Sequence, residues 1–196
     1  MFLEFAIYFR KINLVGDSTE SELRMKNWTK YIITFLTVFL IRLLPFRAPN
    51  VEPIMAVIMP MGKVYSKIMA FAFGFLSIVI FDSITSGIGI WTLITGLAYG
   101  SLGLGASYFF KNHSGWKNYV FYALVGTIFY DVITGLTIGP LFFHQSFMVS
   151  LVGQIPFTLL HLLGNVSFAI VLSPVIEKWI TQPEKSRVLI SGIVRV

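Results

Sequence analysis

The sequence contains no cysteine and little charge. Among 196 residues, only 12% are Asp, Glu, Lys or Arg, against roughly 25% in a typical soluble domain. The absence of cysteine excludes disulfides, iron–sulfur ligation and thiol catalysis. The shortage of charge excludes a soluble globule, because too few polar side chains remain to cover a water-facing surface. With 56% hydrophobic residues and a mean hydropathy of +0.78, the composition predicts an integral membrane protein of one domain.

Motifs for catalysis and metal binding are also missing. The chain has no P-loop, no Gly-x-Ser-x-Gly elbow and no paired carboxylate cluster, so we expect neither ATP hydrolysis nor another enzymatic activity. His113, His144 and His161 lie on different segments without acidic partners at helical spacing, and we expect no metal and no cofactor. The net charge of +6 comes from basic residues between and outside the apolar stretches. It therefore indicates membrane topology, and no nucleic-acid partner is expected.

Apolar stretches predict five membrane spans and a doubtful sixth. The five clear spans are Trp28–Leu44, Val64–Phe81, Ile88–Phe110, Tyr119–Gly135 and Gln154–Ile176. The doubtful run is Val51–Met61, because a helix of this length rises only about 16 Å, roughly half of the hydrocarbon core.

The distribution of lysines decides whether the short run crosses the membrane. If it crosses, Lys63, Lys67, Lys111, Lys117 and Lys178 fall on the same side as the basic residues near both termini, as the positive-inside rule requires. We therefore predict an all-α membrane protein in the cell membrane of a prokaryote. Residues 28–180 form a compact bundle of six transmembrane helices with both termini cytoplasmic, and the second helix is short, tilted or covered by its neighbours. Residues 1–27 form a cytoplasmic or interfacial segment and residues 181–196 a basic cytoplasmic tail.

Two aspartates, Asp82 and Asp131, lie at the predicted outer ends of the third and fifth spans. In one interpretation they face a cavity that opens outward, since an ionisable group near the membrane needs water or a partner. In the other, each caps the following helix by accepting backbone N–H bonds. We expect a cap for at least one of them.

The predicted outer loops are rich in groups that hydrogen-bond and stack. Candidate ligand-binding residues there are Thr85, Trp91, Thr134, Phe143 and His144. Aromatic walls with a few polar groups are what a small organic ligand requires, so these loops predict a binding site on the outer face. The alternative is that Trp91 and Phe143 belong to the aromatic belt at the membrane interface.

In the last span, Gln154, His161 and Asn165 share one helical face. Polar groups on one stripe turn inward in a membrane helix, for ligand contact or for hydrogen bonds between helices, and for Asn165 we expect the second. Pro156 is expected to break this helix one turn above His161.

A proline-rich loop follows the first span and contains Arg47, Asn50 and Glu52. Arg42, just before it, either snorkels to the outer headgroups or pairs with Glu52. The loop is also a candidate lid over the outer pocket, in which Asn50 or Glu52 touches the ligand.

These features resemble the substrate-binding S component of an energy-coupling factor (ECF) vitamin transporter. The resemblance covers Trp28–Trp179 and rests on six helices in a short chain, on Gly-rich aromatic outer loops, and on the Arg-x-x-Pro-x-x-x-Pro-Asn-Val-Glu-Pro stretch at Arg42–Pro53. It implies a membrane-embedded subunit that captures a vitamin or related micronutrient from outside. It further implies association with a transmembrane T component and two cytoplasmic ATPases, and release of the ligand inward as the S component topples in the membrane.

The first helix departs from the family, which often carries Ala-x-x-x-Ala there for docking to the T component. That helix has no alanine, and Ala70 with Gly74 on the third helix is a substitute. The alternative function is a structural membrane protein of the cell-shape type. With Glu52, Asp82 and Asp131 as outer acids, a neutral or cationic aromatic ligand is favoured over an anionic one, unless Arg42 or Arg47 reverses the balance.

Overall fold

A computed structural model of the chain describes residues 28–45 and 51–181, and the described part contains helices and no strands. The chain divides into two compact units, Met1–Thr37 and Val38–Val196. In the first unit, residues 28–37 are helical, and the hydroxyls of Thr34 and Thr37 each donate to a carbonyl one turn back at 2.8 Å. The predicted N-terminal segment and the basic tail from residue 182 lie outside the described residues.

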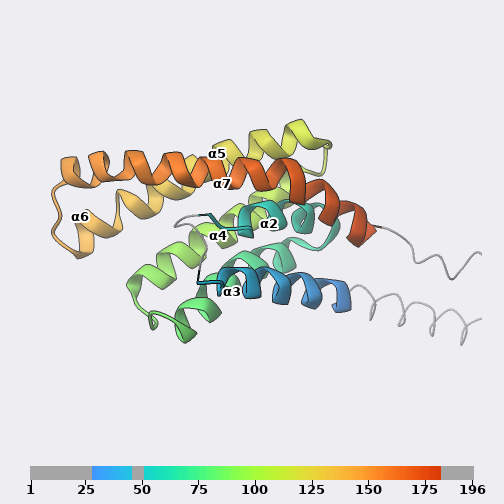
Figure 1. Cartoon of the computed structure of the whole chain (residues 1–196), viewed down its shortest axis with the longest axis horizontal. Helices are drawn as coiled ribbons and strands as arrows, with labels where there is room; N and C mark the ends of the chain where they lie inside the picture. Colours follow the sequence, from blue (N-terminus) through green and yellow to red (C-terminus); the bar gives the residue numbers. More distant parts are fainter. Residues whose placement is uncertain (1–27, 46–50, 182–196) are drawn as a thin grey trace, which may run out of the picture. The chain divides into compact units, whose positions relative to one another are not determined.

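The second unit contains the end of this first helix, which reaches residue 42, and six further helices among its described residues (Figure 1). These are α2 (Ile54–Val64), α3 (Lys67–Ile84), α4 (Ile90–Phe109), α5 (Trp116–Gly135), α6 (Ile138–Phe142) and α7 (Phe147–Thr181). Each predicted span from the second onward therefore corresponds to a helix. The short α6 lies in the connection that was predicted to be a loop.

The break predicted at Pro156 is wrong. Both Pro156 and Pro174 lie inside α7, which continues for 35 residues without interruption. A proline removes one backbone N–H and crowds the preceding turn, but neighbouring helices stabilise such a helix in a membrane protein. α5 and α7 run alongside each other in Figure 1 and pack together.

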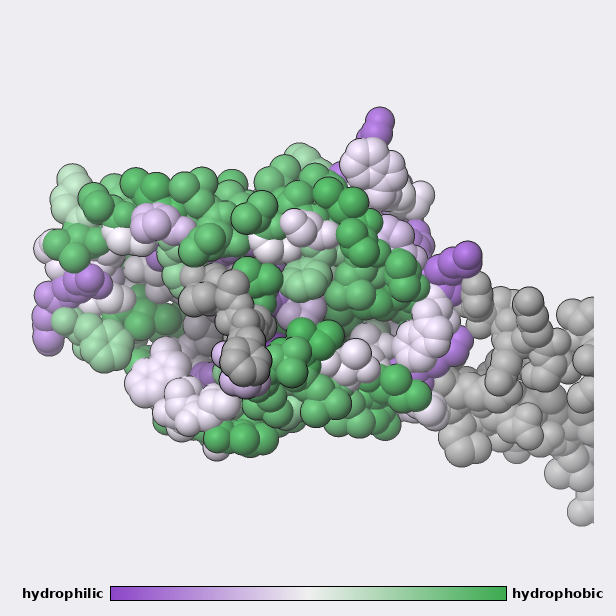
Figure 2. Space-filling model, in the orientation of Figure 1, coloured by the Kyte–Doolittle hydropathy of each residue, from purple (hydrophilic) through white to green (hydrophobic). Residues whose placement is uncertain are grey.

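Three helical segments of the described residues are long and apolar enough to cross a membrane. They are Lys67–Ile84, Trp116–Phe142 and Phe147–Thr181. Their outward side chains are apolar: Leu159, Leu163 and Val171 of α7 are each more than 60% exposed, and Figure 2 shows hydrophobic residues over much of the face on which α7 lies. An exposed apolar surface of this kind needs lipid. The prediction that the described residues are all-helical is confirmed, and three helices long and apolar enough to cross a membrane support the prediction of a membrane protein. The number of spans and the sides of the termini stay predictions.

The short helix α2 forms the centre of the second unit. Its side chains from Ile54 to Gly62 are all buried, and it packs against α3, α4, α5 and α7. A helix that is apolar all round is stable only when it is covered on every side. Of the three options predicted for this helix, the structure shows two, since α2 is short and its neighbours cover it.

A serine from α7 completes the hydrogen bonding of α2. Pro60 has no N–H, so the carbonyl of Ala56, four residues earlier, loses its partner within the helix. The hydroxyl of Ser173, fully buried, donates to this carbonyl at 2.7 Å. An unpaired carbonyl at this depth would be costly, and the serine removes that cost.

Small residues bring α3 and α4 into close contact. A methyl group on Gly74 would overlap the backbone at Tyr99, and one on Gly103 would overlap the backbone at Ala70. Ala70 and Gly74 are accordingly buried. The idea that these two residues dock a T component is wrong, because α4 of the same chain already covers them.

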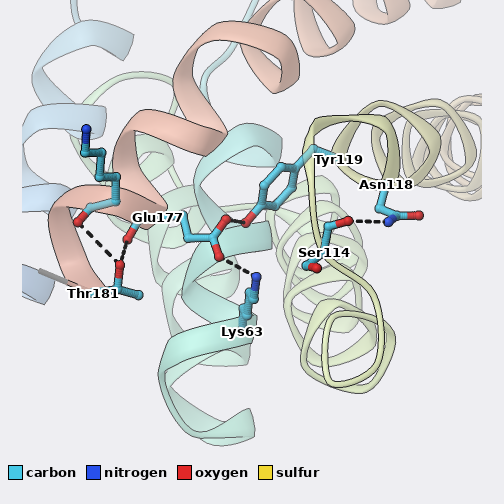
Figure 3. Close-up of polar contacts among 7 residues, drawn as sticks. Lys63, Ser114, Asn118, Tyr119, Glu177 and Thr181 are labelled. Atoms are coloured by element: carbon cyan, nitrogen blue, oxygen red, sulfur yellow. Dashed lines mark hydrogen bonds and ion pairs between the residues drawn. The ribbon is translucent and has the colours of Figure 1, made fainter.

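One end of the second unit, which we call the cationic end, carries Lys63 at the end of α2 and Lys67 at the start of α3. There Glu177 of α7 accepts from Lys63 through Oε1 and from the hydroxyl of Tyr119 through Oε2, the latter at 2.7 Å (Figure 3). The ammonium of Lys67 lies 4.1 Å from the ring of Tyr108, near the end of α4. Because successive helices run in opposite directions, three segments meet at this end: the α2–α3 connection, the α4–α5 connection and the end of α7.

Candidate ligand-binding site

A cavity of about 250 Å³ lies at the opposite end of these helices, which we call the pocket end. Residues of the first helix, the segment before α2, and helices α3, α4, α5 and α7 all contribute to its wall. The lining residues are Arg42, Glu52, Ile78, Phe81, Asp82, Trp91, Thr95, Tyr99, Tyr130, Phe157 and His161.

Arg42 is a buried cation, 5% exposed, on the wall of the cavity. Its Nη1 donates to the carbonyl of Ser77 at 2.5 Å, its Nη2 lies 3.3 Å from Oε1 of Glu52, and the guanidinium lies 4.0 Å from the ring centroid of Phe81. Its Nε has no hydrogen-bond partner among the residues that the structure describes. The predicted pair of Arg42 with Glu52 is confirmed, and snorkelling to the headgroups is wrong, since the head group is held inside the protein.

Asp82 supports the start of α4 by binding the side chain of Thr92. Its Oδ2 accepts from the hydroxyl of Thr92 at 2.6 Å, and the oxygen of that hydroxyl accepts from the backbone N–H of Gly89 at 3.2 Å. Asp131 instead lies inside α5 and is 1% exposed. The capping interpretation is therefore wrong for both aspartates, because neither side chain accepts a backbone N–H bond from the described residues.

Asp131 and His161 form a buried pair between α5 and α7. Nδ1 of His161 lies 2.7 Å from Oδ1 of Asp131, and Nε2 lies 3.4 Å from the hydroxyl of Tyr99. An ionised carboxylate only accepts hydrogen bonds, so with Asp131 ionised the proton of His161 is on Nδ1 and Nε2 faces the tyrosine. Oδ2 of Asp131 is buried and accepts no hydrogen bond from the described residues, so this oxygen can still accept one.

Aromatic rings form the rest of the wall. The rings of Tyr99 and Tyr130 have centroids 4.4 Å apart, and those of Tyr130 and Phe157 lie edge-on to His161 at 5.5 and 5.8 Å. Trp91, which opens α4, is 37% exposed and lies at the rim of this group. The site therefore offers aromatic faces beside a few charged groups, which is typical of a pocket for a small organic molecule.

The structure brings four predicted site residues, Glu52, Asp82, Trp91 and His161, to this one cavity. Asp131 does not line it; this residue is bound to His161 and lines a second hollow. Asn165 is buried and donates to the hydroxyl of Thr127 at 2.8 Å, so the expectation that it bonds between helices is confirmed.

Other predicted residues do not line the cavity. The hydroxyls of Thr85 and Thr134 donate to the carbonyls of Phe81 and Tyr130 in their own helices. Phe143 is 61% exposed and His144 is exposed with a φ of 53°, so both lie on the surface beyond α6. The interfacial interpretation therefore suits Phe143 better than the pocket interpretation.

Gln154 lies in a second, mainly apolar hollow between α5 and α7, where its amide donates to the hydroxyl of Thr158 at 3.2 Å. Asn50 falls outside the described residues.

The main residues missed by the sequence reasoning are aromatic. Tyr99, Tyr130 and Phe157 line the cavity, yet each lies within an apolar stretch where an aromatic residue is ordinarily core or lipid-facing. A usable signal exists on α4, where Trp91, Thr95 and Tyr99 recur at every fourth residue and so share one face.

The described residues contain no group of three or more His, Asp or Glu side chains placed to hold a metal ion. In comparisons with known proteins, residues 22–185 match the model of a family described as a family of unknown function, DUF6580. No curated protein matches the chain, and no solved structure matches it.

Proposed function

We propose that this chain, which belongs to the DUF6580 family, is a membrane-embedded subunit that binds a small organic molecule. The observation that carries the proposal is the cavity at the pocket end, into which six separate segments bring polar and aromatic side chains. Its volume of about 250 Å³ is below the roughly 300–1,000 Å³ of pockets for drug-sized ligands. A molecule the size of a vitamin or a vitamin precursor suits it.

The unmet hydrogen-bonding groups favour binding over a purely structural role. Among the described residues, Arg42 Nε, Asp131 Oδ2 and Asn165 Oδ1 are buried without partners, and of these residues Arg42 lines the cavity. Such groups reduce stability unless something compensates them. A protein whose only task is scaffolding gains nothing from this arrangement. A binding protein recovers the cost when its ligand or the ligand's bound water supplies the missing partner.

The wider role that we propose is that of an S component in an ECF-type importer. In this role the chain captures a micronutrient from outside, and a T component with cytoplasmic ATPases drives its release inside. The sequence has no nucleotide-binding motif, so energy must come from such partners.

We also propose six spans with both termini in the cytoplasm. Lys63, Lys67 and the end of α7 meet at the cationic end, which supports this topology because basic residues gather on the cytoplasmic side. The Cys-free chain allows a labelling test. A cysteine in place of Lys111 reacts with a membrane-impermeant thiol reagent from the cytoplasmic side only, and reaction from outside would contradict the topology.

The binding proposal is tested with the full chain purified in mild detergent. We expect a raised melting temperature with at least one member of a panel of vitamins and their precursors, and the same compound co-eluting from the host membrane by mass spectrometry. Trp91→Ala should weaken its binding about tenfold or more, since a rim aromatic side chain would be lost. Trp116→Ala, which removes an exposed tryptophan at the start of α5, is the matched control.

Absence of any thermal shift over the panel, with no co-eluting compound, would contradict the binding function and favour the structural alternative. The transport role has its own readout. Uptake of the bound compound by cells should require both this chain and ATP, and uptake that persists after ATP depletion would contradict the ECF mechanism.

A further inference from the structure

We propose that the ligand of this cavity is a small organic cation that also carries a hydrogen-bond acceptor. The inference rests on the binding function proposed above and specifies the chemistry of that same site. It follows from the balance of charge, from the way Arg42 is held, and from the aromatic wall.

The charge of the described groups at the site is negative in either protonation state of His161. Arg42 contributes one positive charge, while Glu52, Asp82 and the adjacent Asp131 contribute three negative charges. Neutral His161 leaves the sum at −2, and protonated His161 leaves it at −1. In surroundings of low dielectric constant such an excess attracts a cation and repels an anion.

The arginine on the wall, Arg42, already has a carboxylate partner. Both terminal nitrogens of Arg42 are used, by the Ser77 carbonyl and by Glu52, and the face of its guanidinium lies on Phe81. A ligand carboxylate or phosphate bound to Arg42 would share its positive charge with Glu52 and would lie near Asp82, which carries the same charge as the ligand. The charge of Arg42 is therefore already balanced before a ligand binds.

Asp82 and the rings provide the cation site. Thr92 occupies Oδ2 of Asp82, whereas Oδ1 accepts no hydrogen bond from the described residues. Trp91, Tyr99 and Tyr130 line the same cavity, and an aromatic ring attracts ammonium and pyridinium groups to its face through its quadrupole. A carboxylate beside aromatic rings favours an organic cation over a hydrated metal ion, because the rings cannot replace a metal's oxygen ligands.

The unpartnered Nε of Arg42 specifies the second feature of the ligand. Arg42 is 5% exposed and lines the cavity, so its N–H lacks the partner that a buried donor requires. A hydroxyl or carbonyl oxygen on the ligand would accept this bond. The site is thus suited to a molecule with a positive group near Asp82 and an oxygen near Arg42.

Matched probes test the charge requirement on the full chain in detergent. Choline is compared with its neutral isostere, in which carbon replaces the quaternary nitrogen, and N-methylpyridinium is compared with toluene; benzoate is the anion. Dissociation constants come from titrations of the thermal shift. We expect each cation to bind at least tenfold more tightly than its neutral isostere, and choline to bind more tightly than tetramethylammonium, which lacks the oxygen.

Variants locate the charge. Asp82→Asn keeps an oxygen for Thr92 and should weaken choline binding at least tenfold while leaving the neutral isostere unaffected. Glu177→Gln, at the cationic end, should change neither. The melting temperature without probe shows whether each variant is folded.

The outcomes separate this inference from the proposed function. Equal or tighter binding of the neutral isosteres or of benzoate would overturn the inference and leave the binding function standing. Unchanged choline affinity in a folded Asp82→Asn variant would also overturn it. If no probe and no vitamin of any charge binds, both the inference and the proposed function fail.

Discussion

The two ends of the second unit each contain a charge pair that joins separate segments, but they satisfy it differently. At the cationic end, both oxygens of Glu177 have partners, Lys63 and Tyr119. At the pocket end, Arg42 and Asp131 each keep one buried atom without a partner among the described residues. Complete pairing fastens α2, α5 and α7 together, whereas incomplete pairing leaves hydrogen-bonding capacity for another molecule. This contrast is the reason for proposing ligand binding at the pocket end and not at the cationic end.

The largest effect on stability is expected from Glu52→Ala. The substitution leaves the guanidinium of Arg42, 5% exposed, without its counter-charge, and removing one partner of a buried pair costs about 3 kcal/mol or more. The measurement is the melting temperature of the purified protein without ligand. Glu52→Gln keeps an acceptor for Arg42 and should lose less, so equal losses in the two variants would contradict the explanation.

A smaller loss is expected from Glu177→Ala at the cationic end. Lys63 is 24% exposed at its side chain and regains water when its partner is removed, so the cost should be about 1–2 kcal/mol. Tyr119→Phe, which removes a single hydrogen bond, should cost about 1 kcal/mol. Melting temperatures again provide the measurement. A greater loss in Glu177→Ala than in Glu52→Ala would reverse the comparison between the two ends.

The smallest effects on stability and on ligand affinity are expected from substitutions of the two residues that follow α6. Phe143→Ala and His144→Asn alter exposed side chains, and asparagine tolerates the φ of 53° at residue 144. Each should change stability by less than about 0.5 kcal/mol and leave the affinity for the ligand unchanged. Titration of the thermal shift measures both quantities. A tenfold loss of affinity in either variant would return these residues to the binding site.

Charge and periodicity were sufficient to predict much of the fold. The lysine distribution predicts that residues 51–61 form a separate helix that crosses the membrane. The structure has a helix at Ile54–Val64. The pair of Arg42 with Glu52 and the interhelical bond of Asn165 also followed from simple rules, since buried charges and amides need partners. Helix ends were predicted less well, because α7 continues through Pro156 with neighbours to support it.

The site was predicted only in part, since composition does not give the direction of a side chain. Phe143 and His144 belong to a loop rich in candidate liners, yet the chain turns them outward. Tyr99 and Tyr130 lie in apolar segments, where the pattern indicates core residues. They pack against each other, and Tyr130 packs against His161, on the cavity wall. Such placements depend on how helices rotate against one another, which no local pattern encodes.

The hydrogen bond from Ser173 to Ala56 has a consequence for how the protein is made. α2 is synthesised with a carbonyl that its own Pro60 leaves unpaired, and the partner, Ser173 of α7, follows Ala56 by 117 residues. Lipid offers no substitute for that hydroxyl, so the short helix stays incompletely bonded until α7 has been made. The synthesis of α7 therefore sets the moment at which the hydrogen bonding of α2 is complete.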